Sequence, residues 1–185
     1  MCVICYIPQG VETPPYKVIK AMRIANPHGM GFCTPSQYRK SVANFEVFVR
    51  CLKRRNINEP CLIHFRLATH GSIKQENCHP FHDRKTGVYF AHNGILDIKP
   101  TNDKTDSETA FRKRFLPIIK KYGFESEELK AEVNRIIGGS KFVFMQIAKT
   151  KTKYEEDISV NIKMFGQFEE WLGCYFSNLR FTAYL

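Results

Sequence analysis

The chain begins Met1-Cys2-Val3-Ile4-Cys5-Tyr6-Ile7, an apolar run that predicts a buried strand over residues 2–7. Cys2 directly follows the initiator methionine. Removal of Met1 would leave Cys2 with a free α-amine, whose ordinary pKa of about 7.7–8 makes it a base near neutral pH. A nucleophile and its base would then be held together on one residue by covalent geometry. The alternative is that Cys2 is simply the first buried residue of this strand.

Apolar spacing along the rest of the chain predicts helices and strands in blocks. The predicted helices cover 16–25, 42–55, a segment from about 106 that Pro117 divides, and 127–137. The predicted strands cover 2–7, a short strand after a turn within 29–32, 61–66, 88–92, 95–96, 141–149, 158–165, 174–175 and 180–184. Asn93-Gly94 is the predicted hairpin turn, and Thr105-x-x-Glu108 the predicted helix cap. Strands, then helices, then strands indicate one α+β domain over residues 1–185 rather than an alternating βαβ sheet.

The composition narrows the class of protein. Apolar residues make up 43% of the 185, which is typical of a globular fold and excludes a disordered chain. No apolar run is long enough to span a membrane, and no signal sequence precedes the first strand. The seven cysteines are odd in number and scattered, which favours reduced thiols and a cytoplasmic location. Cys2-x-x-Cys5 has no second Cys or His pair to complete four ligands, so we expect no metal site.

The net charge of +10 is large for this length. It comes largely from four basic clusters: Lys53-Arg54-Arg55, Arg112-Lys113-Arg114, Lys120-Lys121 and Lys149–Lys153. Such clusters bind nucleic acids or acidic proteins. They also occur as solvated faces that keep a protein soluble. The sequence carries no recognised nucleic-acid motif that would separate the two interpretations.

Three further stretches place polar side chains at the ends of predicted elements. In His64-Phe65-Arg66-Leu67-Ala68-Thr69-His70-Gly71 a strand delivers an arginine, which suits either an ion pair or a carboxylate ligand. In Phe90-Ala91-His92-Asn93-Gly94 an amide side chain and a glycine N–H supply the two donors of an oxyanion hole, although a plain turn explains them equally well. Asp106-Ser107-Glu108 is either a helix cap or a carboxylate that holds an ammonium group.

Together these stretches resemble the class II glutamine amidotransferases, whose glutaminase domains are N-terminal nucleophile hydrolases. That family has a mature N-terminal Cys, then His-x-Arg-x-Ala-Thr-His-Gly, then His-Asn-Gly, then an Asp in a Ser/Thr/Asp-rich stretch. All four are present in this order, at Cys2, 64–71, 92–94 and Asp106, and His79-Pro80 also fits. The resemblance covers about residues 2–150. It implies an αββα sandwich of two antiparallel sheets between helix layers.

The resemblance further implies a glutaminase that needs no metal and no organic cofactor. Cys2 would attack the side-chain amide of L-glutamine, form a γ-glutamyl thioester and release ammonia, with Asn93 and Gly94 stabilising the oxyanion. By family match, Arg66 would hold the α-carboxylate of the substrate and Asp106 its α-ammonium group. The remaining substrate-binding residues implied by the match are Leu67, Thr69, His70 and His79.

Two residues depart from the family pattern: Val3 stands where a Gly usually follows the Cys, and Leu67 where an aromatic residue often follows the Arg. Family members usually carry a synthase domain after the glutaminase, whereas this sequence ends at Leu185. We therefore expect a separate synthase or acceptor protein, or a nucleic acid bound by the basic clusters. Two other functions stay open: hydrolysis of γ-glutamyl compounds such as glutathione, and a catalytically silent module that binds an acidic partner.

Overall fold

The computed structural model describes residues 2–68, 72–100, 104–151 and 156–185. Its helices are α1 (Tyr16–Ala25), α2 (Phe45–Lys53), α3 (Asp106–Ala110), α4 (Leu116–Tyr122) and α5 (Glu127–Ile136). Its strands are β1 (Val3–Ile7), β2 (Met30–Cys33), β3 (Tyr38–Ser41), β4 (Cys61–Phe65), β5 (Phe81–Asp83), β6 (Val88–Asn93), β7 (Lys141–Lys151), β8 (Glu156–Phe165), β9 (Glu169–Trp171) and β10 (Cys174–Phe176).

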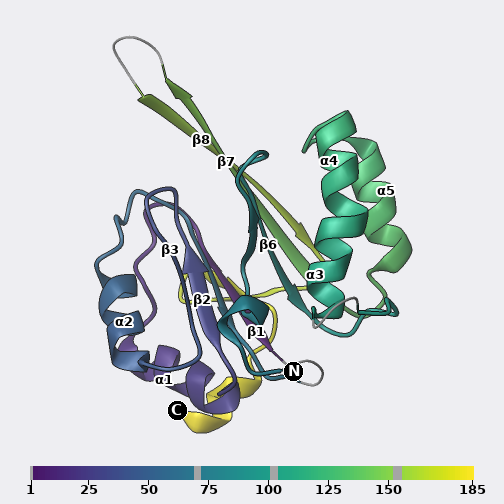
Figure 1. The fold of residues 1–185 in the computed structure, drawn as a ribbon. Coiled ribbons are helices and arrows are strands. Elements are labelled where there is room, and N and C mark those ends of the chain that lie inside the picture. The colour runs from purple at the N-terminus through teal and green to yellow at the C-terminus, as the bar shows by residue number, and fades with distance from the viewer. Residues whose placement is uncertain (1, 69–71, 101–103, 152–155) are drawn as a thin grey trace.

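The strands form two antiparallel sheets (Figure 1). The larger has six strands in the order β3-β2-β4-β1-β10-β9, and the smaller has four in the order β5-β6-β7-β8. β1 lies inside the larger sheet, where it pairs with β4 on one side and with β10 on the other. The strand that follows Cys2 is therefore enclosed by a neighbour from the middle of the chain and by one from its C-terminal end.

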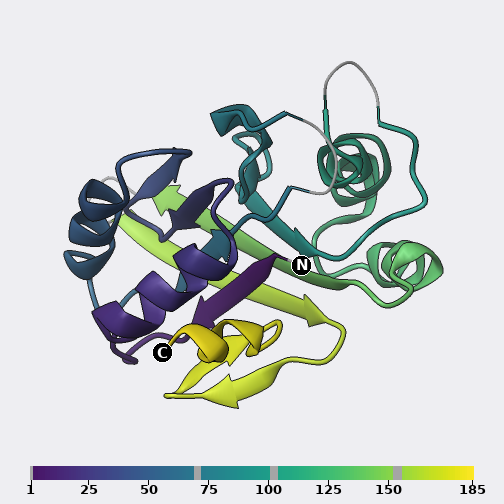
Figure 2. The same ribbon diagram turned by 90° about the horizontal axis from the view of Figure 1, so that it is seen from below.

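Three apolar cores separate four layers of structure (Figure 2). Alternate residues of β1 point to opposite faces, so that Val3, Cys5 and Ile7 pack beneath α1 and α2, whereas Ile4 packs against β7 of the smaller sheet. A third core, rich in phenylalanines such as Phe90, lies between the smaller sheet and α3 to α5. The helices thus cover the outer faces of both sheets. This is the αββα sandwich of the α+β class that the sequence resemblance implies.

The predicted helices are confirmed, with small changes of boundary. Residues 16–25 form α1 as predicted, and the helix predicted over 42–55 begins only at Phe45, because Asn44 has a left-handed φ of 55°. The predicted division at Pro117 is also confirmed. A π-helical segment (Phe111–Phe115) ends there, and α4 follows without a gap, with the proline in its first turn, where it has no N–H to donate. No helix among the described residues is long and apolar enough to cross a membrane.

Two predicted strands are wrong. Residues 95–96 form no strand, since Asn93 ends β6, pairs with Lys141 of β7, and leads into an exposed segment in which Ile95 is 67% accessible. Asn93-Gly94 is therefore a bend at a strand end and not a hairpin turn. The strand predicted over 180–184 is a short 3-10 helix (Arg180–Tyr184) that buries Phe181 beneath the larger sheet. The short strands β3, β5 and β9 were not predicted, because runs of three or four residues leave too little alternation to detect.

Candidate active site

Cys2 lies where the beginning of β1 meets the end of β4. The two strands are antiparallel, with Val3 opposite Phe65, so the residue before β1 is a neighbour of the residues after β4. The Leu67 N–H donates to Cys2 Sγ at 3.3 Å, and Sγ lies 3.5 Å from the Leu67 carbonyl oxygen. Strand pairing thus delivers the cysteine to the loop that carries Arg66.

A cavity of about 30 Å³ lies beside Cys2. Its lining comes from both sheets and from the start of α3: Cys2, Arg66, Leu67, Ala68, His79, His92, Gly94, Thr105, Asp106 and Ser107. Six of the predicted site residues are therefore brought together. Such a volume holds about two water molecules and is too small for glutamine, so a molecule of that size would bind here only if the lining moved. A larger hollow of about 610 Å³ lies near Thr13 and Lys53 and contains none of the predicted site residues.

Two predicted site residues fall in a part of the chain that the structure leaves undescribed. Thr69 and His70 lie outside the described residues. Leu67, predicted to bind substrate, contacts the Cys2 thiol through its backbone N–H and carbonyl. Leu67 also lines the cavity.

Arg66 is placed by the backbone at the end of β4. Its side chain is 3% exposed, its N–H donates to the Gly29 carbonyl at 2.7 Å, and its Nη1 donates to the Ser72 carbonyl at 2.9 Å. A guanidinium carries five N–H donors in a planar fork, which matches the geometry of a carboxylate. Arg66 therefore brings a fixed positive charge to a cavity that also contains a thiol.

Asp106 is the first residue of α3, and the side chain of Thr105 caps this helix by accepting from the Glu108 N–H at 3.1 Å. The predicted cap is thus confirmed. Asp106 Oδ2 accepts from the Leu96 N–H at 2.9 Å, and Oδ1 accepts from the Ser107 N–H at 2.7 Å. Ser107 Oγ also donates to Oδ1, at 3.2 Å. A carboxylate offers about four lone-pair sites, so these three bonds fix its orientation and leave capacity to accept from a cationic group.

Asn93 and Gly94 end β6 on the smaller sheet. Asn93 is 3% exposed and its Nδ2 donates to Ser177 Oγ at 2.8 Å. Gly94 has a φ of +147°, and a Cβ at this position would lie 2.2 Å from Ser140 Oγ. Only glycine fits here, because a side chain would meet both the backbone strain and the serine. Gly94 lines the cavity, whereas Asn93, the residue before it in the sequence, is not part of the lining.

Three histidines are buried in this region: His79 and His92 line the cavity, and His64 packs against His79. The rings of His64 and His79 lie 4.3 Å apart, and His92 Nδ1 is 2.7 Å from Ser107 Oγ. Burial lowers the pKa of His64 to about 3 and that of His92 to about 4, and it holds the pKa of His79 well below its ordinary value. All three are therefore neutral near pH 7, and His79 and His92 give the cavity polar, uncharged lining.

The Cys2 thiol is protonated at neutral pH. Burial raises the pKa of Cys2 above its ordinary value, and the Leu67 N–H and the Arg66 charge oppose this only in part. A thiolate is the nucleophilic form of cysteine, so attack from this position requires a base close to Sγ.

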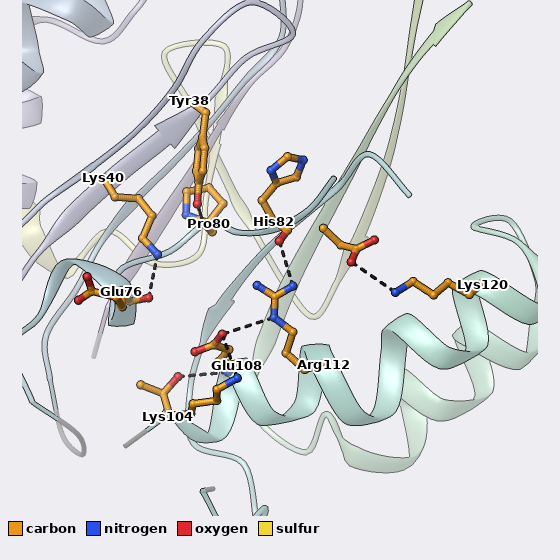
Figure 3. A network of polar contacts seen from close by, with 11 residues as sticks. Tyr38, Lys40, Glu76, Pro80, His82, Lys104, Glu108, Arg112 and Lys120 are labelled. Atoms are coloured by element: carbon orange, nitrogen blue, oxygen red, sulfur yellow. Dashed lines mark hydrogen bonds and ion pairs between the residues drawn. The ribbon is translucent and has the colours of Figure 1, made fainter. Parts of the chain in front are cut away.

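Polar contacts hold the segment that carries His79 against both sides of the molecule (Figure 3). From the larger sheet, Tyr38 Oη donates to the Pro80 carbonyl at 2.7 Å. From the helices on the smaller sheet, Arg112 Nη1 donates to the His82 carbonyl at 3.0 Å. The segment that directly follows His79, a residue of the cavity lining, is thus anchored both to the larger sheet and to the helices on the smaller sheet.

Sequence reasoning missed two residues that contact the predicted site, Ser177 and Asn178. Asn178 Nδ2 donates to the Cys2 carbonyl at 2.9 Å, and Ser177 Oγ accepts from Asn93. Both directly follow the buried strand β10. Polar residues at the end of a buried strand are the same signal that marked Asn93-Gly94, and they could have been singled out on that ground.

Only some of the basic side chains in the predicted clusters are exposed to solvent, where a partner could contact them. Arg55 is 8% exposed, and its guanidinium donates to Thr13 Oγ1 at 2.9 Å, to the Glu59 carbonyl at 2.8 Å and to the Val11 carbonyl. It therefore ties loops together, and only Lys53 and Arg54 of that cluster are exposed. Of the cluster at 149–153, Lys149 is the one basic side chain that the structure describes, and it is exposed.

Comparison with known folds agrees with this arrangement. The solved structure of glutamine phosphoribosylpyrophosphate amidotransferase from B. subtilis, complexed with ADP and GMP, is similar with a TM-score of 0.52 and 16% identity, over 95% of this chain and 41% of that one. A structure of the allosteric regulatory enzyme of purine biosynthesis gives a TM-score of 0.49 and 18% identity, over 78% of this chain and 35% of that one. The chain thus spans about two fifths of the length of the Bacillus enzyme.

Comparison with protein families assigns the sequence to one family. No match to a curated protein was found. The sequence model of the class-II glutamine amidotransferases matches residues 39–141, which is more than half of the chain and includes Arg66, His79, Asn93 and Asp106. With the αββα sandwich and the ordered motifs, this match shows that the chain belongs to the class-II glutamine amidotransferases.

Proposed function

We propose that the chain hydrolyses the side-chain amide of glutamine with Cys2 as the nucleophile, after removal of Met1. The observation that carries this proposal is the position of Cys2 Sγ, which shares one cavity with the guanidinium of Arg66 and the carboxylate of Asp106. A free amino acid has one carboxylate and one ammonium group near its Cα. The two charges can bind these groups and direct the amide end of the substrate toward the thiol.

The reaction begins with proton transfer from the Cys2 thiol to its own α-amine, directly or through one water. The thiolate forms a bond to the amide carbon of glutamine, and the carbonyl becomes an oxyanion that accepts from Asn93 Nδ2 and the Gly94 N–H. The ammonium of Cys2 then returns the proton to the leaving nitrogen, and ammonia departs as the carbonyl re-forms. Water attacks the γ-glutamyl thioester, breaks its carbon–sulfur bond, and yields glutamate and the free thiol.

The first experiment is an intact mass of the purified protein, before and after exposure to a diazo-ketone analogue of norleucine. We expect a mass lower by one methionine, and one added analogue that peptide mapping places on Cys2. Cys2→Ala should abolish ammonia release from glutamine and prevent the adduct. Cys51→Ala is the matched control, because Cys51 is a partly buried free cysteine on α2, remote from the cavity, and its loss should leave both unchanged. A retained Met1, or an adduct on Cys5 or Cys33, would reject the proposal.

The same site would recognise the γ-glutamyl end of larger compounds, so the assay also includes glutathione. Turnover of glutathione without release of ammonia from glutamine would assign the chain to γ-glutamyl hydrolysis instead. Arg66→Ala should lower kcat/KM for glutamine at least tenfold, since loss of a charge-assisted hydrogen bond costs about 1.5–3 kcal/mol.

We further propose that the ammonia is used by an acceptor on a partner protein or elsewhere in a longer chain. Lys53 and Arg54 at the end of α2 and Lys149 on β7 are the exposed basic residues proposed to contact an acidic partner, either a synthase subunit or a nucleic acid. Binding to a DNA duplex should weaken with salt, with a log–log slope of about 0.9 per neutralised phosphate. Binding affinity that does not change between low and high salt would remove nucleic acid as the partner.

All seven cysteines are unpaired, which supports a reducing, cytosolic setting for the protein.

A further inference from the structure

Ser177 is a buried serine that joins the two sheets beside Cys2. It directly follows β10, and its side chain is fully buried. Its N–H donates to the Ile4 carbonyl at 2.9 Å, and its Oγ accepts from the Ile4 N–H at 2.9 Å. The same Oγ accepts from Asn93 Nδ2 at 2.8 Å. One hydroxyl oxygen therefore connects the amide of Asn93 to the backbone of β1.

This connection spans the two halves of the proposed catalytic machinery. Ile4 belongs to β1 of the larger sheet and lies two residues after Cys2, which directly precedes this strand. Asn93 belongs to the smaller sheet and ends β6. The nucleophile and the side-chain donor of the oxyanion hole come from different sheets, and Ser177 Oγ fixes the position of one relative to the other.

The orientation of the Asn93 amide depends on this contact. Asn93 Oδ1 is buried and has no hydrogen-bond partner among the described residues, so the bond from Nδ2 to Ser177 is the polar contact that sets the rotation of the amide. An amide nitrogen carries two N–H groups. Ser177 takes one of them, which leaves the second N–H of Nδ2 as a donor for a substrate oxygen.

Ser177 is itself held from two directions. Lys141 Nζ donates to the Ser177 carbonyl, and Lys141 is the β7 residue that pairs with Asn93. The next residue, Asn178, donates from Nδ2 to the Cys2 carbonyl at 2.9 Å. The segment after β10 thus contacts the strand of the nucleophile and the strand of the oxyanion donor at the same time.

We propose that Ser177 is a positioning residue of the oxyanion hole, acting through Asn93 and not on the substrate itself. The inference rests on the proposed glutaminase function and deepens it. A serine that only filled a buried polar position would affect stability, whereas a positioning residue affects kcat through Asn93.

The test compares Ser177→Ala and Ser177→Cys with Asn93→Ala and with the double variant Asn93→Ala/Ser177→Ala, in the processed protein. The cysteine variant keeps a buried side chain of similar shape with a weaker acceptor, so it remains folded if the alanine variant does not. Ser126→Ala is the matched control, because Ser126 caps α5 far from the cavity and accepts from the Leu129 N–H. The measurements are kcat and KM for glutamine, and the affinity for an aldehyde analogue of glutamine relative to glutamate.

We expect Ser177→Ala to lower kcat by tenfold or more with KM changed less than twofold, and Ser177→Cys to lie between it and wild type. Loss of an oxyanion donor typically costs 10²–10³ in kcat, so Asn93→Ala should be the more severe variant. In the Asn93→Ala background the second change should have no further effect on kcat, because the residue through which it acts is gone. The aldehyde, whose adduct carries the oxyanion, should lose affinity while glutamate does not.

Three results would overturn the inference while the proposed function stands: wild-type kcat in Ser177→Ala, additive effects in the double variant, or equal losses of aldehyde and glutamate affinity. A processed wild-type protein that releases no ammonia would instead reject the proposed function, and the role of Ser177 with it.

Discussion

At the scale of single residues, the site depends on positions that tolerate little change, and Gly94 is the clearest. Its φ of +147° and the 2.2 Å approach of an added Cβ to Ser140 Oγ leave no room for a side chain. We expect Gly94→Ala to lower the free energy of unfolding by about 1–3 kcal/mol and to reduce kcat, because the N–H of this residue is a proposed oxyanion donor.

Gly139→Ala is the control for this prediction. An added Cβ there meets no atom within 4 Å, and Gly139 is not among the glycines with positive φ. Urea unfolding and steady-state ammonia release, measured on both variants, separate local strain from a general effect of the substitution. Wild-type kcat in a folded Gly94→Ala protein would show that this N–H takes no part in the reaction.

At the scale of elements, the N-terminus of α3 fixes the carboxylate proposed to hold the substrate ammonium. Thr105 caps this helix by accepting from the Glu108 N–H, and Asp106 is the first helical residue. We expect Thr105→Ala to destabilise the protein by about 1 kcal/mol and to raise KM for glutamine, since the first turn would no longer hold Asp106 in place. Thr105→Ser should restore both properties.

Ser126→Ala on α5 removes an equivalent cap and provides the comparison. It should lower the unfolding free energy by a similar amount without changing KM, because nothing on α5 lines the cavity. Equal KM values in the two variants would mean that the cap of α3 stabilises the fold only.

At the scale of the whole molecule, the buried histidines make stability depend on pH. The folded-state pKa values of about 3 for His64 and about 4 for His92 lie below the ordinary value of 6.5. The unfolded chain therefore binds these protons more readily, so stability is complete above pH 6.5 and falls as the pH decreases toward 4. The full loss is on the order of 3–5 kcal/mol per histidine.

Urea midpoints measured between pH 7 and pH 5 isolate this effect, because the carboxylates titrate below that window. We expect the midpoint to fall steadily over the interval, and His64→Gln to reduce the slope. A midpoint that does not change between pH 7 and pH 5 would contradict the assignment of neutral, buried imidazoles.

The sequence predicted most elements because their signals are local. The helix over 16–25 is marked by its apolar spacing, and the break at Pro117 by a residue that cannot donate a backbone hydrogen bond. The failures occurred where a distant partner decides the local structure. Asn93-Gly94 has the composition of a hairpin turn, but β6 pairs with β7, so the chain bends away instead of turning back.

The sequence by itself determined the family and led to the proposed reactive groups, because the ordered motifs at Cys2, Arg66, Asn93 and Asp106 are carried by short stretches of chain. Only the tertiary structure decided how these groups are held together. Ser177 contacts Ile4 across 173 residues and Asn93 across 84, through strands that pair only in the folded chain. Local periodicity specifies which face of a strand is buried, but pairing between distant strands depends on the packing of the whole molecule, and no short stretch encodes it.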